Sequence, residues 1–97
     1  MKIYRVNMTD LTVRSEDVPE KWEGLGGRAL TSAIVAEEVE PTCHPLGRKN
    51  KLVFAPGLLT GTIAPNSGRM SVGAKSPLTG GIKESNAGGS AAQKLAR

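Results

Sequence analysis

Short stretches in which apolar and polar residues alternate predict strands in this chain. The first, residues 2–8 (KIYRVNM), is separated by a Thr-Asp pair from residues 11–15 (LTVRS). Two such segments joined by a short turn are typical of a β-hairpin. An apolar run at residues 51–55 (KLVFA) predicts a buried strand, and the alternation in residues 69–75 (RMSVGAK) predicts a further one.

A helix is predicted over residues 28–40, because apolar side chains recur there at helical spacing. Pro41 ends it. Its C-terminal part carries three glutamates, which oppose the helix dipole, so the helix must be stabilised mainly by its neighbours. We also expect a short helix that Asp17 caps, with Pro19 in its first turn, and a last helix over residues 88–97.

These strands and helices predict the α+β class, with a core that is small for 97 residues. Hydrophobic residues make up 38% of the chain, three residues are aromatic, and twelve are glycines that fill no core. We therefore expect the chain to pack against more protein. The last helical pattern stops at Arg97 without a capping signal. We expect residues 1–97 to be a piece of a longer protein that is truncated at its C-terminal end.

Targeting signals do not appear in the sequence. One cysteine excludes an internal disulfide framework. No apolar run approaches the ~18 residues that a membrane span needs, and the N-terminal residues lack the apolar centre of a signal peptide. We therefore expect a cytoplasmic protein with no membrane partner.

Charge is distributed unevenly along the chain. Residues 1–40 carry five basic and eight acidic side chains, a net charge of −3, whereas residues 41–97 carry eight basic side chains and one acidic side chain, Glu84, a net charge of +7. A glycine-rich half with this excess favours an anionic partner, such as a phosphate, a nucleotide or nucleic acid. The scarcity of aromatic residues argues against single-stranded nucleic acid, whose bases stack on aromatic side chains.

Residues 57–69 (GLLTGTIAPNSGR) are the first candidate ligand-binding stretch. Their glycines let backbone N–H groups approach an anion closely, and Arg69 ends the stretch with a planar fork suited to phosphate. Short polar side chains supply further donors: Thr60, Thr62, Asn66 and Ser67. The same composition fits a connection between two strands with a solvated arginine. These residues alone leave both interpretations open.

Residues 74–89 (AKSPLTGGIKESNAGG) are the second candidate stretch. Their Ser-Pro and Gly-Gly pairs indicate a turn, after which the chain leads into the last predicted helix. The start of a helix is a ready anion site. Asn86 or Ser85 could equally cap that helix by bonding its backbone donors, and both interpretations stay open.

Two other motifs favour structural roles. Residues 24–30 (GLGGRAL) place Arg28 at a helix start after three glycines, but they lack the glycine spacing of a dinucleotide-binding fold, so a joint between helices is favoured. Cys43 and His44 are adjacent, with no second pair of ligands and no other histidine in the sequence. A loop is therefore favoured there over a metal or catalytic site.

The order of these motifs, rather than any one of them, resembles a known family. The succession GGRAL, PTCHPLGRKNKLVFAPGLLTGTIAPNSGR and AKSPLTGGIKESNAGG is similar to the N-terminal domain of the tungsten-dependent aldehyde:ferredoxin oxidoreductases. The similarity runs from about Ile3 to the last residue without a large gap. Leu58 stands where the family usually has proline, a departure that concerns the details of cofactor packing.

The resemblance implies a fold and a cofactor. In that family the N-terminal domain forms paired β-sheets beneath a bis-molybdopterin that holds tungsten or sometimes molybdenum. Matched by motif, Arg69 would contact the pterin and its phosphates. Asn86 would line the pterin and offer its backbone carbonyl to a magnesium ion that bridges the phosphates, and Gly88 would lie with its backbone against the cofactor. Lys75 and Lys83 would add to the positive field without contacts assigned to them.

The resemblance also implies an activity for a longer chain. The full enzyme would oxidise an aldehyde to a carboxylic acid in anaerobic metabolism and pass electrons through a [4Fe–4S] cluster to ferredoxin. The present segment would supply no catalytic residue and would not bind the cluster, and alone it would be inactive. The expected partners are the remainder of the chain and ferredoxin, not nucleic acid, with a homodimer as an option.

Two alternatives to this function stay open at the level of sequence. One is a small non-catalytic module that binds phosphate-rich ligands or RNA through the basic half, and the other is a split or decayed paralogue of the family. The reading frame downstream of Arg97 distinguishes them from the oxidoreductase, which requires a continuation that contains a spaced set of cysteines.

Overall fold

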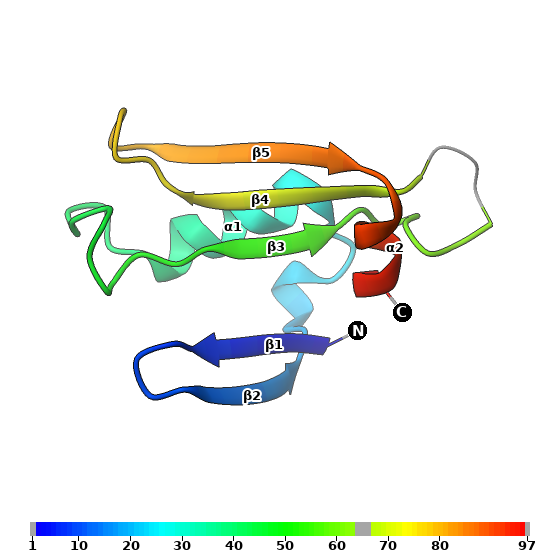
Figure 1. Cartoon of the computed structure of the whole chain (residues 1–97), viewed down its shortest axis with the longest axis horizontal. Coiled ribbons are helices and arrows are strands. Elements are labelled where there is room, and N and C mark those ends of the chain that lie inside the picture. The colour runs from blue at the N-terminus through cyan, green and yellow to red at the C-terminus, as the bar shows by residue number, and fades with distance from the viewer. Residues whose placement is uncertain (1, 64–66, 97) are drawn as a thin grey trace.

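The computed structural model describes residues 2–63 and 67–96, and in them a three-stranded antiparallel sheet forms the centre of the fold (Figure 1). Its strands are β3 (Val53–Pro56), β4 (Arg69–Lys75) and β5 (Ile82–Gly88), with β4 in the middle. Helix α1 (Gly27–Glu38) covers one face and contacts all three strands, and α2 (Ser90–Ala96) packs against β3 and β4. The predicted α+β class is confirmed.

A hairpin precedes this sheet, as the sequence predicts. Strands β1 (Lys2–Asn7) and β2 (Thr12–Asp17) pair in antiparallel fashion. The turn between them spans residues 8–11 and is longer than the predicted Thr-Asp pair. Leu11 belongs to the turn because its φ of 54° lies in the left-handed region, outside the range of a strand.

The prediction that Asp17 caps a helix is wrong. Asp17 is the last residue of β2, where it lies opposite Lys2 and forms an ion pair with it at 3.1 Å. The chain after Pro19 forms a single 3₁₀ turn, η1 (Glu20–Trp22), with no side-chain cap. The carboxylate is thus used across the hairpin rather than at a helix start.

Glycine at position 73 lets α1 lie close to β4. A Cβ atom added to Gly73 would come within 2.8 Å of the Thr31 Cβ and 2.9 Å of the Thr31 Oγ1. Thr31 is fully buried in α1, and its hydroxyl donates to the Arg28 carbonyl at 3.1 Å. Because neither side has room to yield, this contact sets the separation between the helix and the sheet.

The apolar core is small and lies around α1. One cluster of buried side chains contains Trp22, Leu30, Ile34 and Ala55, and a second contains Val35, Val39 and Cys43. Val53 packs against both clusters and joins them. Helix α1 confirms the prediction for residues 28–40, since its apolar side faces this core.

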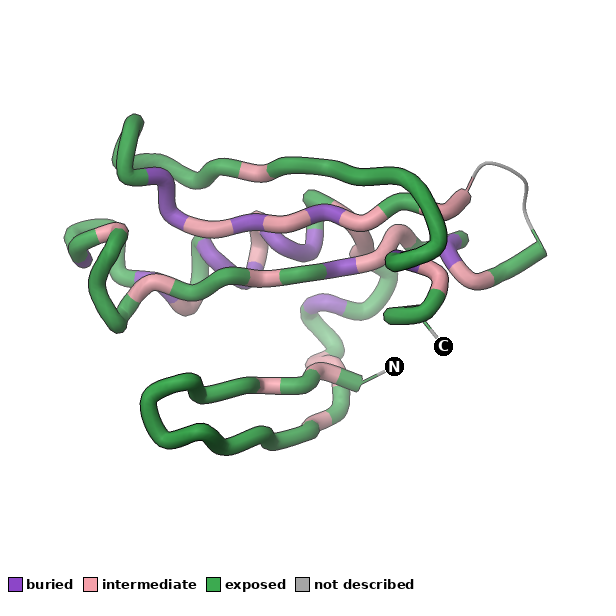
Figure 2. Tube along the Cα trace, in the orientation of Figure 1, coloured by how far each residue is buried: buried purple, intermediate pink, exposed green. Residues whose placement is uncertain are grey.

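Many of the remaining large apolar side chains are exposed, and the hairpin is exposed along most of its length (Figure 2). Tyr4, Val6 and Val13 are exposed on the hairpin. Phe54 in β3 is 53% exposed, while its neighbour Ala55 is buried. The prediction of a buried strand at residues 51–55 is therefore right for the face that carries Ala55 and wrong for the face that carries Phe54.

Strand β5 is the element that the sequence does not predict. Residues 74–89 hold the end of β4, a turn at residues 76–81, and all of β5. Ser85 and Asn86 lie inside β5, so neither of them caps a helix, and α2 begins only at Ser90. Backbone pairing with β4, rather than a pattern of apolar side chains, holds this segment in a strand.

Ion pairs attach the hairpin and η1 to the C-terminal half of α1. The guanidinium of Arg5 donates to both Glu38 carboxylate oxygens, at 2.7 and 2.8 Å, and to Glu16 at 2.7 Å. Lys51 donates to Glu38 at 2.7 Å, and Lys21 pairs with Glu37. These contacts confirm that neighbouring elements stabilise a helix whose glutamates oppose its own dipole.

The same contacts change the acidity of Glu38. The hydrogen bonds from Arg5, followed by those from Lys51, lower the pKa of Glu38 from its ordinary 4.5 to about 2, against the opposing effect of burial. The pKa of Arg5 is raised correspondingly, by its bonds to Glu38 and then Glu16. A carboxyl whose pKa is lower in the folded state stabilises the fold above its unfolded pKa and loses that contribution as the pH falls.

Replacement of Gly73 by alanine is expected to lower the free energy of unfolding by roughly 1–3 kcal/mol, because the added methyl group overlaps Thr31. Chemical denaturation measures the change. Gly81→Ala is the matched control, since a Cβ at Gly81 would meet its nearest neighbour, Thr79 Oγ1, at 3.7 Å. Equal stabilities of the two variants would contradict the role of the Gly73–Thr31 contact.

Replacement of Glu38 by glutamine is expected to destabilise the protein by about 1 kcal/mol at pH 7, where the carboxylate is charged and paired. The difference from the wild type should shrink as the pH falls from about 4.5 toward 2, because the wild-type carboxyl is then protonated as well. Unfolding curves recorded across this range test the sign. Glu40→Gln, at an exposed glutamate, should show a smaller effect, and a difference that does not vary with pH would refute the assignment.

Candidate functional site

The three residues singled out by resemblance lie together at one end of the sheet. Arg69 is the first residue of β4 and is directly opposite Gly88 on β5, and the next pair on the same face joins Ser71 to Asn86. Residues at alternate positions of a strand share a face. Arg69, Asn86 and Gly88 therefore share one face of two neighbouring strands, and all three are exposed. We call these three residues the corner site.

The N-terminus of α1 borders the corner site. A Cβ on Gly27 would lie 3.4 Å from Ser71 Oγ, and one on Gly26 would lie 2.7 Å from the Leu58 backbone nitrogen. Gly27 has a φ of 55°, which favours glycine, and no side chain of the described residues caps the helix start. The glycines of residues 24–30 thus let the helix start approach β4 and the residues after β3.

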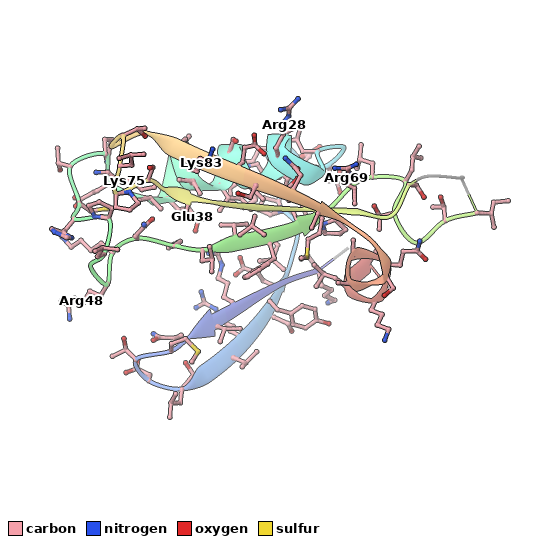
Figure 3. The ribbon with its side chains drawn as sticks, turned by 45° about the horizontal axis from the view of Figure 1, so that its top comes forward. Arg28, Glu38, Arg48, Arg69, Lys75 and Lys83 are labelled. Atoms are coloured by element: carbon pink, nitrogen blue, oxygen red, sulfur yellow. The ribbon has the colours of Figure 1, made fainter. Side chains whose placement is uncertain are left out.

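Arg28 adds a second cation at this end of the sheet. Figure 3 shows Arg28 and Arg69 toward the end where β5 runs into α2, whereas Lys75 and Arg48 lie toward the opposite end. The sequence alone favours a structural joint for Arg28. Its place beside the corner site follows from the packing of α1 on β4 and β5, which no local motif predicts.

Two residues that contact the corner site, Ser71 and Glu84, are not among the site residues that the sequence singles out. The Ser71 hydroxyl donates to Asn86 Oδ1 at 2.5 Å, and Asn86 Nδ2 donates to the Glu84 carboxylate. Glu84 also lies 3.8 Å from the Arg28 guanidinium. Both residues become recognisable only once the register of β4 and β5 is known.

The polar side chains of residues 57–69 mostly close their own loop. The buried Thr60 hydroxyl donates to the Ser67 carbonyl at 2.5 Å, and the Thr62 hydroxyl donates to the Leu59 carbonyl at 2.5 Å. Asn66 lies outside the described residues. Of the candidates in this stretch that the structure describes, Arg69 is the one in the corner site.

The two lysines expected to add to the positive field lie away from the corner site. Lys75 is buried, and its ammonium group donates to the carbonyls of Pro41 and of Cys43, the latter at 2.7 Å. Lys83 is exposed, but it alternates with Glu84 on β5 and so points to the other face of the sheet. Lys75 therefore anchors the segment after α1.

The adjacent Cys43 and His44 lie in a loop, as favoured from the sequence. Cys43 is buried, and His44 Nδ1 accepts a hydrogen bond from the Leu46 backbone nitrogen at 3.1 Å. Within residues 2–63 and 67–96, no three His, Cys, Asp or Glu side chains are grouped as a metal site would require. In the same residues, no helix is long and apolar enough to span a membrane.

The corner site lies on the exposed surface of the protein. Cavities of about 370 and 200 Å³ lie elsewhere, the first lined by Asp17 and Trp22 and the second on the sheet face that carries Lys83. The corner site offers the guanidinium of Arg69 and, at Gly88, a backbone that carries no side chain. Strand β5 is also an edge strand, so along its outer side its backbone groups have no partner strand among the described residues. A guanidinium beside accessible backbone groups can bind a phosphate group.

The architecture defines an α+β domain with an open, cationic, glycine-bearing corner. A family model described as the aldehyde ferredoxin oxidoreductase N-terminal domain matches residues 3–97. The chain is 46% identical to the tungsten-containing aldehyde ferredoxin oxidoreductase of Pyrococcus abyssi, 45% to that of Pyrococcus furiosus and 42% to that of Thermococcus kodakarensis. The chain therefore belongs to the aldehyde ferredoxin oxidoreductase family, in its N-terminal domain.

The matches cover most of this chain but only a small part of each relative. They cover 91% of this chain but 15% of each relative. The chain thus spans about 15% of the length of the curated relatives, at the domain that the family model names as N-terminal.

Proposed function

We propose that this chain is the pterin-binding N-terminal part of a tungsten-dependent aldehyde oxidoreductase and that the corner site holds the phosphate end of the pterin. Arg69 would pair with a phosphate, Gly88 would let the ligand lie against the backbone, and the Asn86 carbonyl would face a bridging magnesium ion. The observation that carries the proposal is the juxtaposition of these three residues on adjacent strands, in register, at an exposed edge.

The remaining functions of the enzyme belong to residues beyond this segment in our proposal. When bound, the tungsten or molybdenum bis-molybdopterin supplies the two-electron chemistry that converts an aldehyde to a carboxylic acid. Electrons would leave for ferredoxin through a [4Fe–4S] cluster held elsewhere in a longer chain, in a cytoplasmic enzyme. The present residues bind and orient the cofactor and supply no catalytic acid or base.

The placement of positive side chains in the second half of the chain supports this proposal over the alternative of an RNA-binding module. Lys75 is buried and Lys83 lies on the face of the sheet opposite the corner site, so neither lysine extends the positive charge of Arg69 into the basic stripe that tracks a nucleic-acid backbone. The Arg69 guanidinium, with Arg28 at the same end of the sheet, instead suits a compact anion such as a phosphate.

Arg69→Ala in the full-length enzyme is expected to lower the bound pterin and tungsten per chain, because a charge-assisted contact of about 1.5–3 kcal/mol to a phosphate is lost. Metal analysis and the fluorescence of the released, oxidised pterin measure both contents. Arg48→Ala is the matched control, since Arg48 is exposed in a loop at the opposite end of the sheet (Figure 3). Unchanged pterin and tungsten in the Arg69 variant would refute the proposed site.

Gly88→Ala in the full-length enzyme is expected to lower pterin content while the protein still folds. A Cβ at Gly88 would meet its nearest atom, the Gly68 carbonyl oxygen, at an ordinary 3.6 Å, and the φ of Gly88 is not positive. The methyl group would instead take up space at the exposed surface of the corner site. Thermal unfolding of the apoenzyme separates this effect from a folding defect, and a variant with full pterin content would show that no ligand lies against Gly88.

A further inference from the structure

The side chain of Asn86 is bonded within the protein rather than directed away from it. Its Oδ1 accepts from the Ser71 hydroxyl at 2.5 Å, and its Nδ2 donates to the Glu84 carboxylate. Ser71 is 2% exposed on the central strand, so this donor is fixed in place. Glu84 stands two residues before Asn86, on the same face of β5. The amide is therefore held along the sheet from both sides.

Glu84 is held in turn by the start of α1. One of its carboxylate oxygens lies 3.8 Å from the Arg28 guanidinium, while the other accepts from Asn86. Ser71, Asn86, Glu84 and Arg28 thus form one chain of polar contacts from the buried centre of β4, across β5, to the first turn of α1. This chain connects the corner site to the two elements that the Gly73–Thr31 contact locks together.

A carboxylate at this position works against the binding of an anion. Glu84 is the single acidic residue among residues 41–97, and it stands next to a site whose other charges are positive. Its negative charge offsets part of the field of the arginines. What a carboxylate provides here is a charge-assisted hydrogen bond to the Asn86 amide, which is stronger and more directional than a bond between neutral groups.

We propose that Ser71, Glu84 and Arg28 are positioning residues, which hold the Asn86 side chain against the sheet so that the β5 backbone from Asn86 to Gly88 is presented to the ligand. The inference rests on the proposed function, because it takes the ligand to be the phosphate end of the pterin. Asn86 then acts through its main chain, and its side chain fixes the shape of the strand.

The test exchanges the two partners of one hydrogen bond in the full-length enzyme. In Asn86→Asp, a carboxylate faces the Glu84 carboxylate, and bound pterin after dialysis should fall roughly three- to tenfold. In the double variant Glu84→Gln/Asn86→Asp, the glutamine amide donates to the new carboxylate, the net charge equals that of the wild type, and Ser71 can still donate to position 86. Pterin content should then return to within about twofold of the wild-type value.

Rescue by the double variant is the result that a direct contact between the Asn86 amide and the ligand would not give. If the Asn86 amide itself contacts the pterin, the double variant stays as low as Asn86→Asp and the proposal is overturned. If Asn86→Asp retains full pterin, the proposal is overturned as well. Ser71→Ala, which removes only a hydroxyl, provides a milder variant in case Asn86→Asp fails to fold, and it too should lower pterin. Glu40→Gln, the same chemical change at an exposed glutamate, should leave pterin unchanged.

Arg69→Ala, measured in parallel, separates this proposal from the proposed function. A loss of pterin in Arg69→Ala without loss in the Asn86 and Ser71 variants overturns the positioning role and leaves the corner site in place. Full pterin in all of these variants overturns both.

Discussion

The close approach of α1 to β4 is the constraint on which the rest of the structure depends. Gly73 has no side chain, and the buried Thr31 fills the space that a Cβ would take. Because the helix is seated at this depth, its first turn comes level with Ser71, and Arg28 comes within reach of Glu84. The same packing brings Leu30 and Ile34 into the core. The absence of a Cβ atom at Gly73 thus lets α1 take the position that fixes both the core and the border of the corner site.

Polar contacts carry an unusual share of the organisation, because the core is small. The hairpin exposes Tyr4 and Val6, while Arg5 joins it to Glu38 of α1. Lys75, buried at the end of β4, binds two carbonyls of the segment that follows α1. Charge-assisted bonds of this kind fix orientation better than apolar contacts of the same size. They suit a domain whose apolar outer surfaces are exposed and whose polar residues define its shape.

The sequence predicts the elements that have an apolar side and does not predict those that lack one. Helix α1 and β4 were expected within a residue or two, because apolar residues recur in each at the period of its structure. In β4 these residues, Met70, Val72 and Ala74, are half-buried, whereas the buried face carries Ser71, Gly73 and Lys75. Strand β5 has little apolar content and is exposed on almost all residues, so periodicity carries no signal for it. The three residues of the corner site were expected from family resemblance, but their convergence depends on the β4–β5 register. Ser71, Glu84 and Arg28 could not be predicted for the same reason.

The glycine-rich stretch at residues 74–89 combines two opposed properties. The glycines, at Gly88 and in the turn before β5, carry no side chain and so leave the backbone accessible. Such a backbone is mobile unless other contacts restrain it. Pairing with β4 restrains one edge of β5, and the bonds from Ser71 and Glu84 to Asn86 restrain its face. An edge strand that is held on one edge and one face keeps its other edge open to a ligand in a fixed shape. In this way a glycine-rich segment with few apolar side chains can still present a preorganised surface.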